Sequence, residues 1–594
     1  MSHYHDVRWP EISLALGSLT PRWATRAAAL GTLCGGLTRF GRQNEVSGKK
    51  FRILVPEALG DEGIRILRET PDAETDVKVG LSRQELLDII ENYDAVITRS
   101  GTSMDKAVID AAKQLKVIAR AGVGVDNVDI QEASRRGIVV INAPTGNTLA
   151  AAEQTMALML AMMRHVPQAH SSLVQGEWNR KKFTGHQLNG KKILIIGLGR
   201  IGTQVGVRCR SFGMEVFALD PYVSEKRIQE LGFQRMTDLA GALSLADVVT
   251  VHVPITNETR CVINEKMLRA MKQGSYLINC ARGGIVDEEA CAQALRDGRL
   301  AGAAFDVFSQ EPPSAENPLF ADDIADKVTL SPHLGATTVE AQTEVARIAV
   351  TNVLAALRGE RYDHAVNLPF MEQYLDDTQK NFVRLARKMG ILAARLVEID
   401  GGQPQKCQVM LRGEKLVDED APGNRKRPYT IAFIKGLLEV AHGPETNYMV
   451  APILAAERGI AVEESFGESR TYRNSIEVTV TSQNSNATLT GTITEEGRQH
   501  IVKVNDYYID FNPHGQLFMF QNHDRPGVIG KVGTLLGKSS VNIANFSLGR
   551  KEMSGLALAV MEVDGVISDD LLSEMAHDGD MIWATTVKLN GEGE

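Results

Sequence analysis

Cysteine is scarce in this sequence, and no two cysteines have the spacing of a metal site. The chain has 594 residues, of which six are cysteines. No CxxC pair occurs among them, so we interpret them as free thiols of a reducing compartment and predict no metal site. The six are Cys34, Cys209, Cys261, Cys280, Cys291 and Cys407.

Long apolar runs and an excess of positive charge are also missing. The longest uninterrupted apolar run, residues 156–163, is far shorter than the ~20 residues that a helix needs to cross a bilayer. The formal net charge of −9 disfavours nucleic acid and anionic membranes as main partners, because both select basic proteins. With 43% hydrophobic and 23% charged residues, the chain has the composition of a soluble globular protein with three or four domains.

Residues 1–50 differ in composition from the rest of the chain. They contain seven Lys and Arg residues against three acids, and residues 21–43 contain four arginines and no acid. This pattern resembles an organelle presequence, but an unstructured tail or upstream sequence included by a misjudged start codon explains it equally well. We therefore expect a cytoplasmic protein, or one of the plastid stroma or mitochondrial matrix if the segment is a transit peptide.

From Phe51 onwards, short apolar strands alternate with helices, which predicts parallel sheets covered by helices on both faces. The first unit has predicted strands at 51–57, 95–100, 115–127 and 137–144 and helices at 61–69 and 104–113. Residues 142–148, NAPTGNT, form a predicted hinge before a long apolar helix at 150–164. The second unit has six strand-like runs, enough for a dinucleotide-binding sheet, at 191–196, 214–220, 246–254, 275–280, 303–308 and 328–332.

The pattern changes after residue 367. A helix at 338–357 carries the chain back towards the first unit, and a second helix is expected at 380–399. Alternating strands follow at 475–482, 487–497 and 500–511. Residues 516–589 then read strand, helix, strand, strand, helix, strand, which is the split βαβ arrangement.

A glycine-rich turn, GLGRIG, follows the first strand of the second unit. Gly197 permits a tight turn, Gly199 lets the backbone approach a pyrophosphate, and Gly202 packs the next helix against the strand. The following strand ends in Asp220, which is placed to bond a ribose hydroxyl and to repel the 2′-phosphate of NADP. Although a GxGxxG pattern alone is weak evidence, this context predicts NAD as the cofactor.

Three polar residues, Arg282, Glu311 and His333, stand at or just beyond predicted strand ends, where ligands bind in open α/β sheets. Oxidation of a 2-hydroxy acid needs a bidentate ligand for the carboxylate, a base for the hydroxyl proton and an acid that orients the base. Arginine, histidine and glutamate suit these roles. Taken singly, each has a structural alternative: an internal ion pair, a backbone-bonded histidine and a solvated loop acid.

Several long motifs identify the chain as similar to the D-2-hydroxyacid dehydrogenase family. They are GLGRIG, the segment 277–288, AAFDVFSQEPP and SPHLGATTVEAQ. RSGT at 99–102, RAGVGVDNVD at 120–129 and WNRKKF at 178–183 resemble the phosphoglycerate-oxidising branch of that family more closely. APILAAERGIAVEES and the C-terminal NHDRPGVIG resemble its long form, which adds an intervening domain and a regulatory ACT domain.

The resemblance implies roles for particular residues. Arg282, Glu311 and His333 would be catalytic, with His333 as acid/base and Arg282 as carboxylate ligand. NAD would contact Val123, Gly197, Gly199, Arg200, Ile201, Gly202, Asp220, Val253, Cys280, Ala281, Arg282, Asp306, His333, Leu334, Gly335 and Ala336. The substrate would contact Arg99, Ser100, Gly122, Val123, Arg180 and Arg282, and an effector would contact Asn522, Asp524 and Asn542.

Two of these assignments leave alternatives. Arg180 lies in a basic loop that in this family can reach a neighbouring subunit's site, but it also reads as part of a solvated basic patch. Asn522 replaces the histidine of some serine-regulated relatives, so the ACT domain either binds L-serine or serves only for assembly. Cys280 is expected to pack rather than to act as a nucleophile.

The sequence thus predicts two Rossmann-like doubly wound parallel-sheet lobes, an α+β intervening domain and a ferredoxin-like ACT domain. The expected substrate domain comprises 51–147 and 338–367, the NAD domain 148–337, the intervening domain 378–514 and the ACT domain 516–594. The resemblance implies NAD-dependent oxidation of 3-phospho-D-glycerate to 3-phosphooxypyruvate by a homo-oligomer, a dimer or a tetramer. The alternatives are a glycerate or glyoxylate dehydrogenase and an NAD-sensing corepressor-type binding protein.

Overall fold

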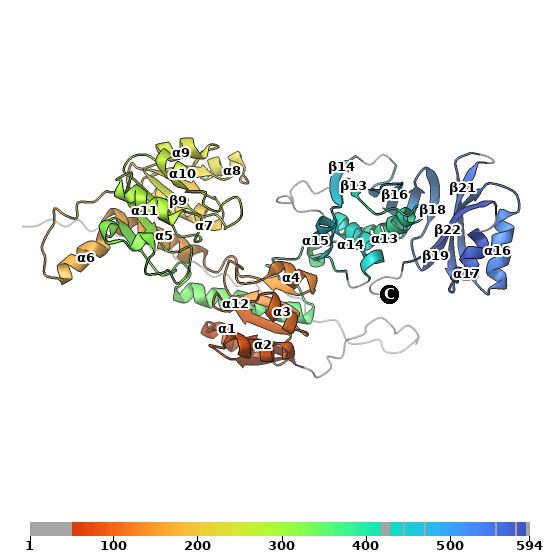
Figure 1. The fold of residues 1–594 in the computed structure, drawn as a ribbon, viewed down its shortest axis with the longest axis horizontal. Helices are drawn as coiled ribbons and strands as arrows, with labels where there is room; N and C mark the ends of the chain where they lie inside the picture. The colour runs from red at the N-terminus through yellow and green to blue at the C-terminus, as the bar shows by residue number, and fades with distance from the viewer. Residues whose placement is uncertain are drawn as a thin grey trace, which may run out of the picture. The chain divides into compact units, whose positions relative to one another are not determined.

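The structure, a computed structural model, describes residues 50–416, 428–443, 446–468, 471–552, 555–576 and 579–589. The presequence prediction for 1–50 falls outside these residues except for Lys50, and so does Cys34. None of the helices that the structure describes is long and apolar enough to cross a membrane. Figure 1 colours the chain from red at the N-terminus to blue at the C-terminus, and its labels for helices and strands are used below.

The first α/β unit contains a five-stranded parallel sheet in the order β2-β1-β3-β4-β5. One face packs against α1 and α12, and the other packs against α2, α3 and α4. The strands are β1 (Phe51–Val55), β2 (Ala73–Val77), β3 (Ala95–Thr98), β4 (Val117–Arg120) and β5 (Val139–Ile141). The helices are α1 (Asp61–Glu69), α2 (Arg83–Ile89), α3 (Lys106–Ala111), α4 (Ile130–Arg135) and, from later in the chain, α12 (Val339–Arg358).

The second unit contains a seven-stranded parallel sheet in the order β12-β11-β10-β9-β6-β7-β8, which is the dinucleotide-binding order with one added strand. The strands are β6 (Lys192–Ile196), β7 (Glu215–Leu219), β8 (Gln234–Arg235), β9 (Val248–Val251), β10 (Ser275–Asn279), β11 (Leu300–Phe305) and β12 (Val328–Leu330). The helices are α5 (Thr148–Met163), α6 (Val166–Val174), α7 (Arg200–Ser211), α8 (Glu225–Glu230), α9 (Leu239–Leu245), α10 (Glu265–Ala270) and α11 (Glu288–Arg296).

Side chains of β6 alternate between two hydrophobic cores, because successive strand residues point to opposite faces. Leu194 and Ile196 belong to the core that contains residues of α9, α10 and α11. Ile193 and Ile195 belong to the core that contains residues of α5, α7 and α8. The sheet is therefore covered on both faces, and its carboxyl edge is left open for the residues of the site.

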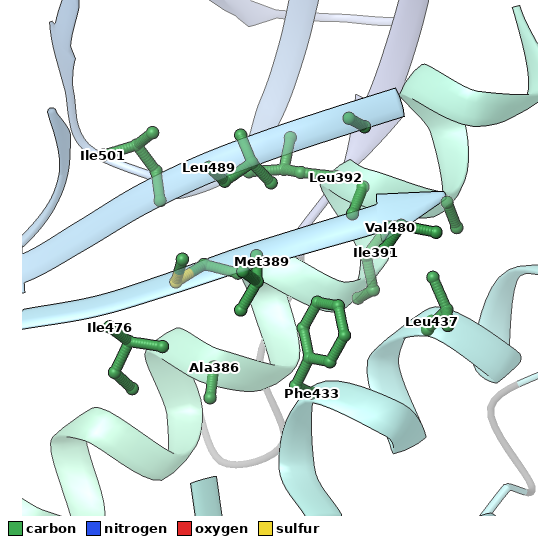
Figure 2. Packing of buried hydrophobic residues seen from close by; sticks show 14 of the residues in the cluster. Ala386, Met389, Ile391, Leu392, Phe433, Leu437, Ile476, Val480, Leu489 and Ile501 are labelled. Carbon is green, nitrogen blue, oxygen red and sulfur yellow. The ribbon is translucent and has the colours of Figure 1, made fainter. Parts of the chain in front are cut away.

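The intervening region combines helices with a mixed six-stranded sheet in the order β14-β13-β15-β16-β17-β18. The helices are α13 (Asp377–Glu398), α14 (Pro428–His442) and α15 (Ala451–Glu457). The strands are β13 (Lys406–Arg412), β14 (Ala461–Gly467), β15 (Ser475–Thr481), β16 (Asn486–Ile493), β17 (Gln499–Val504) and β18 (Tyr507–Phe511). Figure 2 shows α13 and α14 packed against this sheet through Ala386, Met389, Leu392, Phe433, Leu437, Ile476, Leu489 and Ile501.

The prediction of a single strand at 500–511 is wrong. The structure has two antiparallel strands, β17 and β18, joined by a tight turn at Asn505 and Asp506. Asn505 has a φ of 49°, a left-handed conformation that asparagine tolerates better than most residues.

The C-terminal region forms an antiparallel sheet in the order β20-β21-β19-β22 with two helices, which is the expected ferredoxin-like arrangement. Phe518 and Phe520 of β19 share a core with Leu536 of α16 and Leu571 of α17. The elements are β19 (Gln516–His523), α16 (Val528–Lys538), β20 (Asn542–Arg550), β21 (Leu556–Asp564), α17 (Asp569–Ala576) and β22 (Met581–Lys588).

Candidate active site

His333 and Glu311 form a hydrogen-bonded pair beyond the carboxyl ends of β12 and β11. His333 Nδ1 lies 2.6 Å from Glu311 Oε2, and the backbone N–H of Phe308 donates to Glu311 Oε1 at 3.1 Å. Burial alone would raise the pKa of Glu311, but the bonds from His333 and Phe308 and the charge of Arg282 lower it below its usual value. The carboxylate is therefore the acceptor, Nδ1 carries the proton, and Nε2 of the neutral imidazole can accept another.

A second histidine beside the site, His252, is unsuited to acid–base chemistry. It follows β9, and its Nε2 lies 3.0 Å from the buried hydroxyl of Thr250. Burial lowers the pKa of His252 to about 4, so its ring stays neutral near pH 7. Of the two histidines, only His333 is paired with a carboxylate that stabilises its protonated form.

Arg282 follows β10 and has a weak partner in the protein. Its Nε donates to Asp126 Oδ2 at 3.3 Å, and a terminal nitrogen donates to the carbonyl of Ala281 at 2.7 Å. Asp126 is 62% exposed, and ion pairs this exposed contribute ~1 kcal/mol or less. A substrate carboxylate with two aligned hydrogen bonds would readily replace Asp126.

A cavity of about 480 Å³ brings most of the predicted residues together. Of the predicted set, the cavity is lined by Val123, Gly199, Arg200, Ile201, Val253, Cys280, Ala281, Arg282, Asp306, His333, Gly335 and Ala336. Gly122, Gly197, Gly202, Asp220 and Leu334 are not in its lining, and neither are Arg99, Ser100, Arg180 and Glu311. Glu311 is connected to the cavity through its hydrogen bond to His333. Both α/β units contribute to the walls, so a ligand here would lie between them.

The glycine-rich turn fits a dinucleotide pyrophosphate. Gly197 has a φ of 92°, and a Cβ there would lie 2.6 Å from the carbonyl oxygen of His252. A Cβ at Gly199 would meet nothing within 4 Å, which leaves open space above the start of α7. Among the residues that the structure describes, no side chain caps α7, so its first N–H groups are available to an anion.

Asp220 follows β7 and already accepts two backbone hydrogen bonds. Its Oδ2 accepts from Leu198 N and its Oδ1 from Tyr222 N, both at 2.8 Å. Each carboxylate oxygen has a second lone pair, so the side chain can still accept a ribose hydroxyl. The residues present therefore fit NAD.

Glu57 shapes the segment 99–102, which contains the predicted substrate residues Arg99 and Ser100. The Glu57 carboxylate accepts hydrogen bonds from Thr98 Oγ1 and from the N–H groups of Arg99, Gly101 and Thr102, at 2.6–2.9 Å. These bonds fold the segment 99–102, which includes Arg99 and Ser100, around the Glu57 carboxylate.

Arg120 at the end of β4 is a residue that the sequence analysis did not select. Its pKa is lowered, first by burial and then by the charge of Arg282. Its Nε is buried and has no hydrogen-bond partner among the residues that the structure describes. The charges of Asp126 and Glu57 raise the pKa again, but not enough to restore its ordinary value. A buried cation beside other arginines, with an unbonded Nε, indicates that an anion belongs here, since burying a charge without a hydrogen-bonded partner is costly. The sequence signal that could have identified Arg120 is its position two residues before Gly122, a predicted substrate contact.

Arg180 is not brought to this cavity within one chain. It lies in an exposed loop beside Trp178, which is 80% exposed, and no residue of 175–187 lines the cavity.

The three predicted effector residues are not brought together either. Asn522 and Asp524 lie at the end of β19, whereas Asn542 begins β20 at the opposite end of the same sheet. Asn542 donates to Asp564 at 2.9 Å, and Asp524 pairs with Arg550 at 3.3 Å. A single ligand bound by all three would need a second copy of the domain.

We expect Cys280 to resist alkylation. Its thiol is buried beside Asp306, and burial raises its pKa to about 12, so little thiolate exists near pH 8. Iodoacetamide should modify the exposed Cys261 at least ~10-fold faster than Cys280, measured peptide by peptide by mass spectrometry. Equal rates would contradict the packing role.

Other lining residues were also missed by the sequence analysis. Asp126 lies near the end of the predicted strand at 115–127 and Asn147 lies in the predicted hinge at 142–148, but no sequence signal indicated that they face the cavity. Asn147 Oδ1 is buried and has no partner among the described residues.

Two family models match this chain. Residues 156–335 match the D-isomer specific 2-hydroxyacid dehydrogenase NAD binding domain, and residues 378–505 match the D-3-phosphoglycerate dehydrogenase intervening domain. A solved structure, the TT0316 protein of Thermus thermophilus, is 36% identical and covers 53% of this chain and 100% of its own, with a TM-score of 0.50.

Curated relatives extend the similarity over most of the chain. D-3-phosphoglycerate dehydrogenase of Archaeoglobus fulgidus is 41% identical over 543 residues, 91% of this chain and 100% of that protein. The Synechocystis enzyme of the same name is 39% identical over 91% of this chain and 95% of its own. D-3-phosphoglycerate dehydrogenase 2, chloroplastic, of Arabidopsis thaliana is 38% identical over 87% and 83%. The chain belongs to the D-3-phosphoglycerate dehydrogenases, within the D-isomer specific 2-hydroxyacid dehydrogenase family.

Proposed function

We propose that this protein oxidises 3-phospho-D-glycerate to 3-phosphooxypyruvate with NAD, the entry to serine synthesis. The family supports the activity. The observation that supports the site assignment is that Arg282 and His333 line one cavity beside the glycine-rich turn, with Glu311 hydrogen-bonded to His333.

Arg282 is the proposed ligand of the substrate carboxylate. Its planar guanidinium can donate two parallel hydrogen bonds, which fixes the orientation of the carbon that bears the hydroxyl. Binding would exchange the exposed Asp126 partner for the substrate, so the arginine gains a better partner than it has in the free protein. The alternative, in which Asp126 is the permanent partner of Arg282, predicts a different effect of Asp126→Asn and is tested by that variant.

His333 is the proposed base. Its Nε2 would accept the hydroxyl proton while the carbon–oxygen double bond forms, and Glu311 would stabilise the resulting imidazolium through Nδ1. NAD, when bound, supplies the acceptor for the hydride that leaves the same carbon. Because the pKa of Glu311 is lowered, its carboxylate remains charged through the pH range in which histidine titrates.

The phosphate of the substrate needs further cations, since it has nearly two negative charges near pH 7. Arg99 and Arg120 are the proposed ligands from the same chain, because the charge of Arg120 lies close to those of Arg282 and Arg99 and its Nε has no hydrogen-bond partner among the described residues. Arg180 is the proposed ligand from a neighbouring subunit, because its own loop does not reach the cavity of its chain. This assignment requires a homo-oligomer, a dimer or a tetramer.

We expect Arg180→Ala to raise the KM for 3-phosphoglycerate by ~10-fold or more, the cost of losing a hydrogen bond between two charged groups. The KM for D-glycerate, which lacks the phosphate, should change less than ~2-fold. Steady-state kinetics on both substrates tests this, with Arg269→Ala as a control because Arg269 is an exposed arginine that does not line the cavity. Equal effects on the two substrates would remove Arg180 from phosphate recognition.

The direct test of the function is NADH formation from 3-phosphoglycerate, followed by absorbance and compared with D-glycerate, glyoxylate and lactate. Selectivity for the phosphorylated substrate is expected. A preference for an unphosphorylated acid would favour another dehydrogenase of the family, and no turnover with intact NAD binding would favour a corepressor-type protein.

The regulatory and cellular assignments are separate proposals. L-serine is the proposed effector of the C-terminal domain, supported by the motif that contains Asn522 and Asp524, and NADH formation with and without serine tests it. We propose a cytoplasmic location, or an organelle matrix if residues 1–50 act as a presequence.

A further inference from the structure

The Asp306 carboxylate lies buried beneath the turn that carries His333, and both of its oxygens are bonded. Asp306 is 1% exposed. Its Oδ1 accepts from Leu334 N at 2.8 Å and from Ser331 Oγ at 2.6 Å. Its Oδ2 accepts from Gly335 N at 2.8 Å. The carboxylate therefore holds the chain on the C-terminal side of His333 through two amides and on the N-terminal side through a hydroxyl.

These bonds surround a residue in an unfavourable conformation. His333 has a φ of 54°, in the left-handed region, and its N–H donates to the carbonyl of Asp306 at 2.7 Å. A non-glycine residue in this region costs ~1 kcal/mol or more and persists only where its surroundings fix it. The position of the His333 imidazole at the wall of the cavity therefore depends on the bonds of Asp306.

Helix α5 adds a further connection to this turn. Gln154 Nε2 donates to Ser331 Oγ at 3.1 Å and lies 3.4 Å from Asp306 Oδ1. A Cβ built at Gly335 would lie 3.8 Å from Ala151 Cβ, so α5 also packs directly against the turn. Because α5 begins immediately after the segment that joins the two α/β units, it connects that segment to the turn that carries His333.

We propose that Gln154, Ser331 and Asp306 are positioning residues that fix the His333 turn against α5. The proposal rests on the proposed function, in which His333 is the base. Gln154 and Ser331 touch neither the cavity nor the reacting atoms, and they act through Asp306. Asp306 was expected to contact the cofactor, and this role is additional, since its oxygens are already engaged by the turn.

Ser331→Ala removes the hydroxyl that joins Gln154 to Asp306. We expect kcat to fall ~10-fold to 100-fold, since small displacements of a catalytic group have effects of this size. The Kd for NAD should stay within ~2-fold, because no proposed phosphate or ribose contact changes. The primary isotope effect on kcat, with substrate deuterated at the carbon that bears the hydroxyl, should rise because hydride transfer becomes rate-limiting.

Two further variants separate positioning from a general loss of folded protein. Ser331→Thr keeps the hydroxyl and should recover most of the rate, and Ser244→Ala, which removes an exposed hydroxyl bonded to Gly241, should match the unmodified protein. A lower kcat with an unchanged isotope effect would overturn the proposal, because it would report fewer active molecules rather than a slower chemical step. An unchanged kcat would overturn it as well.

The rate of chemical modification of His333 can be measured without substrate, so it tests the positioning role independently of the proposed function. Diethyl pyrocarbonate modifies histidine rings, and the rate at His333 can be followed by peptide mass spectrometry with His500 as an internal standard. We expect Ser331→Ala to accelerate modification of His333 alone, since its ring leaves Glu311 more often. An unchanged rate would overturn the proposal, whereas failure of the unmodified protein to oxidise phosphoglycerate would overturn only the proposed function.

Discussion

Replacing His333 with alanine is expected to lower kcat by ~10³-fold, because the proton of the substrate hydroxyl loses its acceptor. The Kd for NAD should change less than ~3-fold, because the glycine-rich turn and α7 remain intact. Glu311→Gln should have a smaller effect, ~10-fold to 100-fold, since the base stays in place but its protonated form loses a charged partner. Stopped-flow or steady-state NADH formation and a fluorescence titration with NADH give both quantities.

A matched control is available in the intervening region. His500 Nδ1 lies 2.6 Å from Asp510 Oδ1, the same distance that separates His333 from Glu311, but this pair is not at the cavity. His500→Ala should leave kcat within ~2-fold of the unmodified protein if only the His333 pair takes part in the reaction. Loss of NAD binding in His333→Ala would instead show that His333 maintains the fold of the site.

Arg282→Gln should lower kcat/KM for 3-phosphoglycerate by ~10²-fold to 10⁴-fold, because the carboxylate loses a charged, bidentate ligand beside the reacting carbon. Arg282→Lys should recover only part of this loss, since a lysine keeps the charge but cannot donate two parallel bonds. The measurement is kcat/KM from initial rates at low substrate concentration.

The Asp126→Asn variant tests whether Asp126 or the substrate carboxylate is the functional partner of Arg282. If the substrate replaces Asp126 on binding, this change should leave kcat/KM the same or raise it slightly, because the competing carboxylate is lost. If instead Arg282 and Asp126 form a permanent structural pair, Asp126→Asn should be as damaging as Arg282→Gln. That result would remove Arg282 from substrate binding.

The sequence predicted those parts of the fold in which local pattern and tertiary role agree. Buried strands such as β6 (KILII) and β10 (SYLIN) have a run of apolar residues at their centre, and the glycine-rich turn has few alternatives once it follows such a strand. β2 was missed because it is an edge strand whose sequence, AETDV, contains two acids and one fully buried residue. β8 has only two residues, both exposed, and carries no apolar signal at all.

The candidate site was predicted in part for a similar reason. Arg282, Glu311 and His333 follow strands whose carboxyl ends must meet, so parallel topology brings them to one edge. Asp126, which lines the cavity, and Arg120, whose charge acts on Arg282, come from the other α/β unit, and a linear sequence does not say which residues of that unit lie near this edge. Likewise, the motif that groups Asn542 with Asn522 does not reveal that they lie at opposite ends of one sheet.

The central claim is that Arg282 and the His333–Glu311 pair bind one substrate molecule beside the nicotinamide. A crystal structure of the complex with NADH and 3-phosphoglycerate tests it most directly. We predict that both oxygens of the substrate carboxylate accept bonds from Arg282 and that the hydroxyl lies within hydrogen-bonding distance of His333 Nε2. A substrate held elsewhere in the cavity, with His333 bonded only to Glu311 and Arg282 still paired with Asp126, would contradict the account.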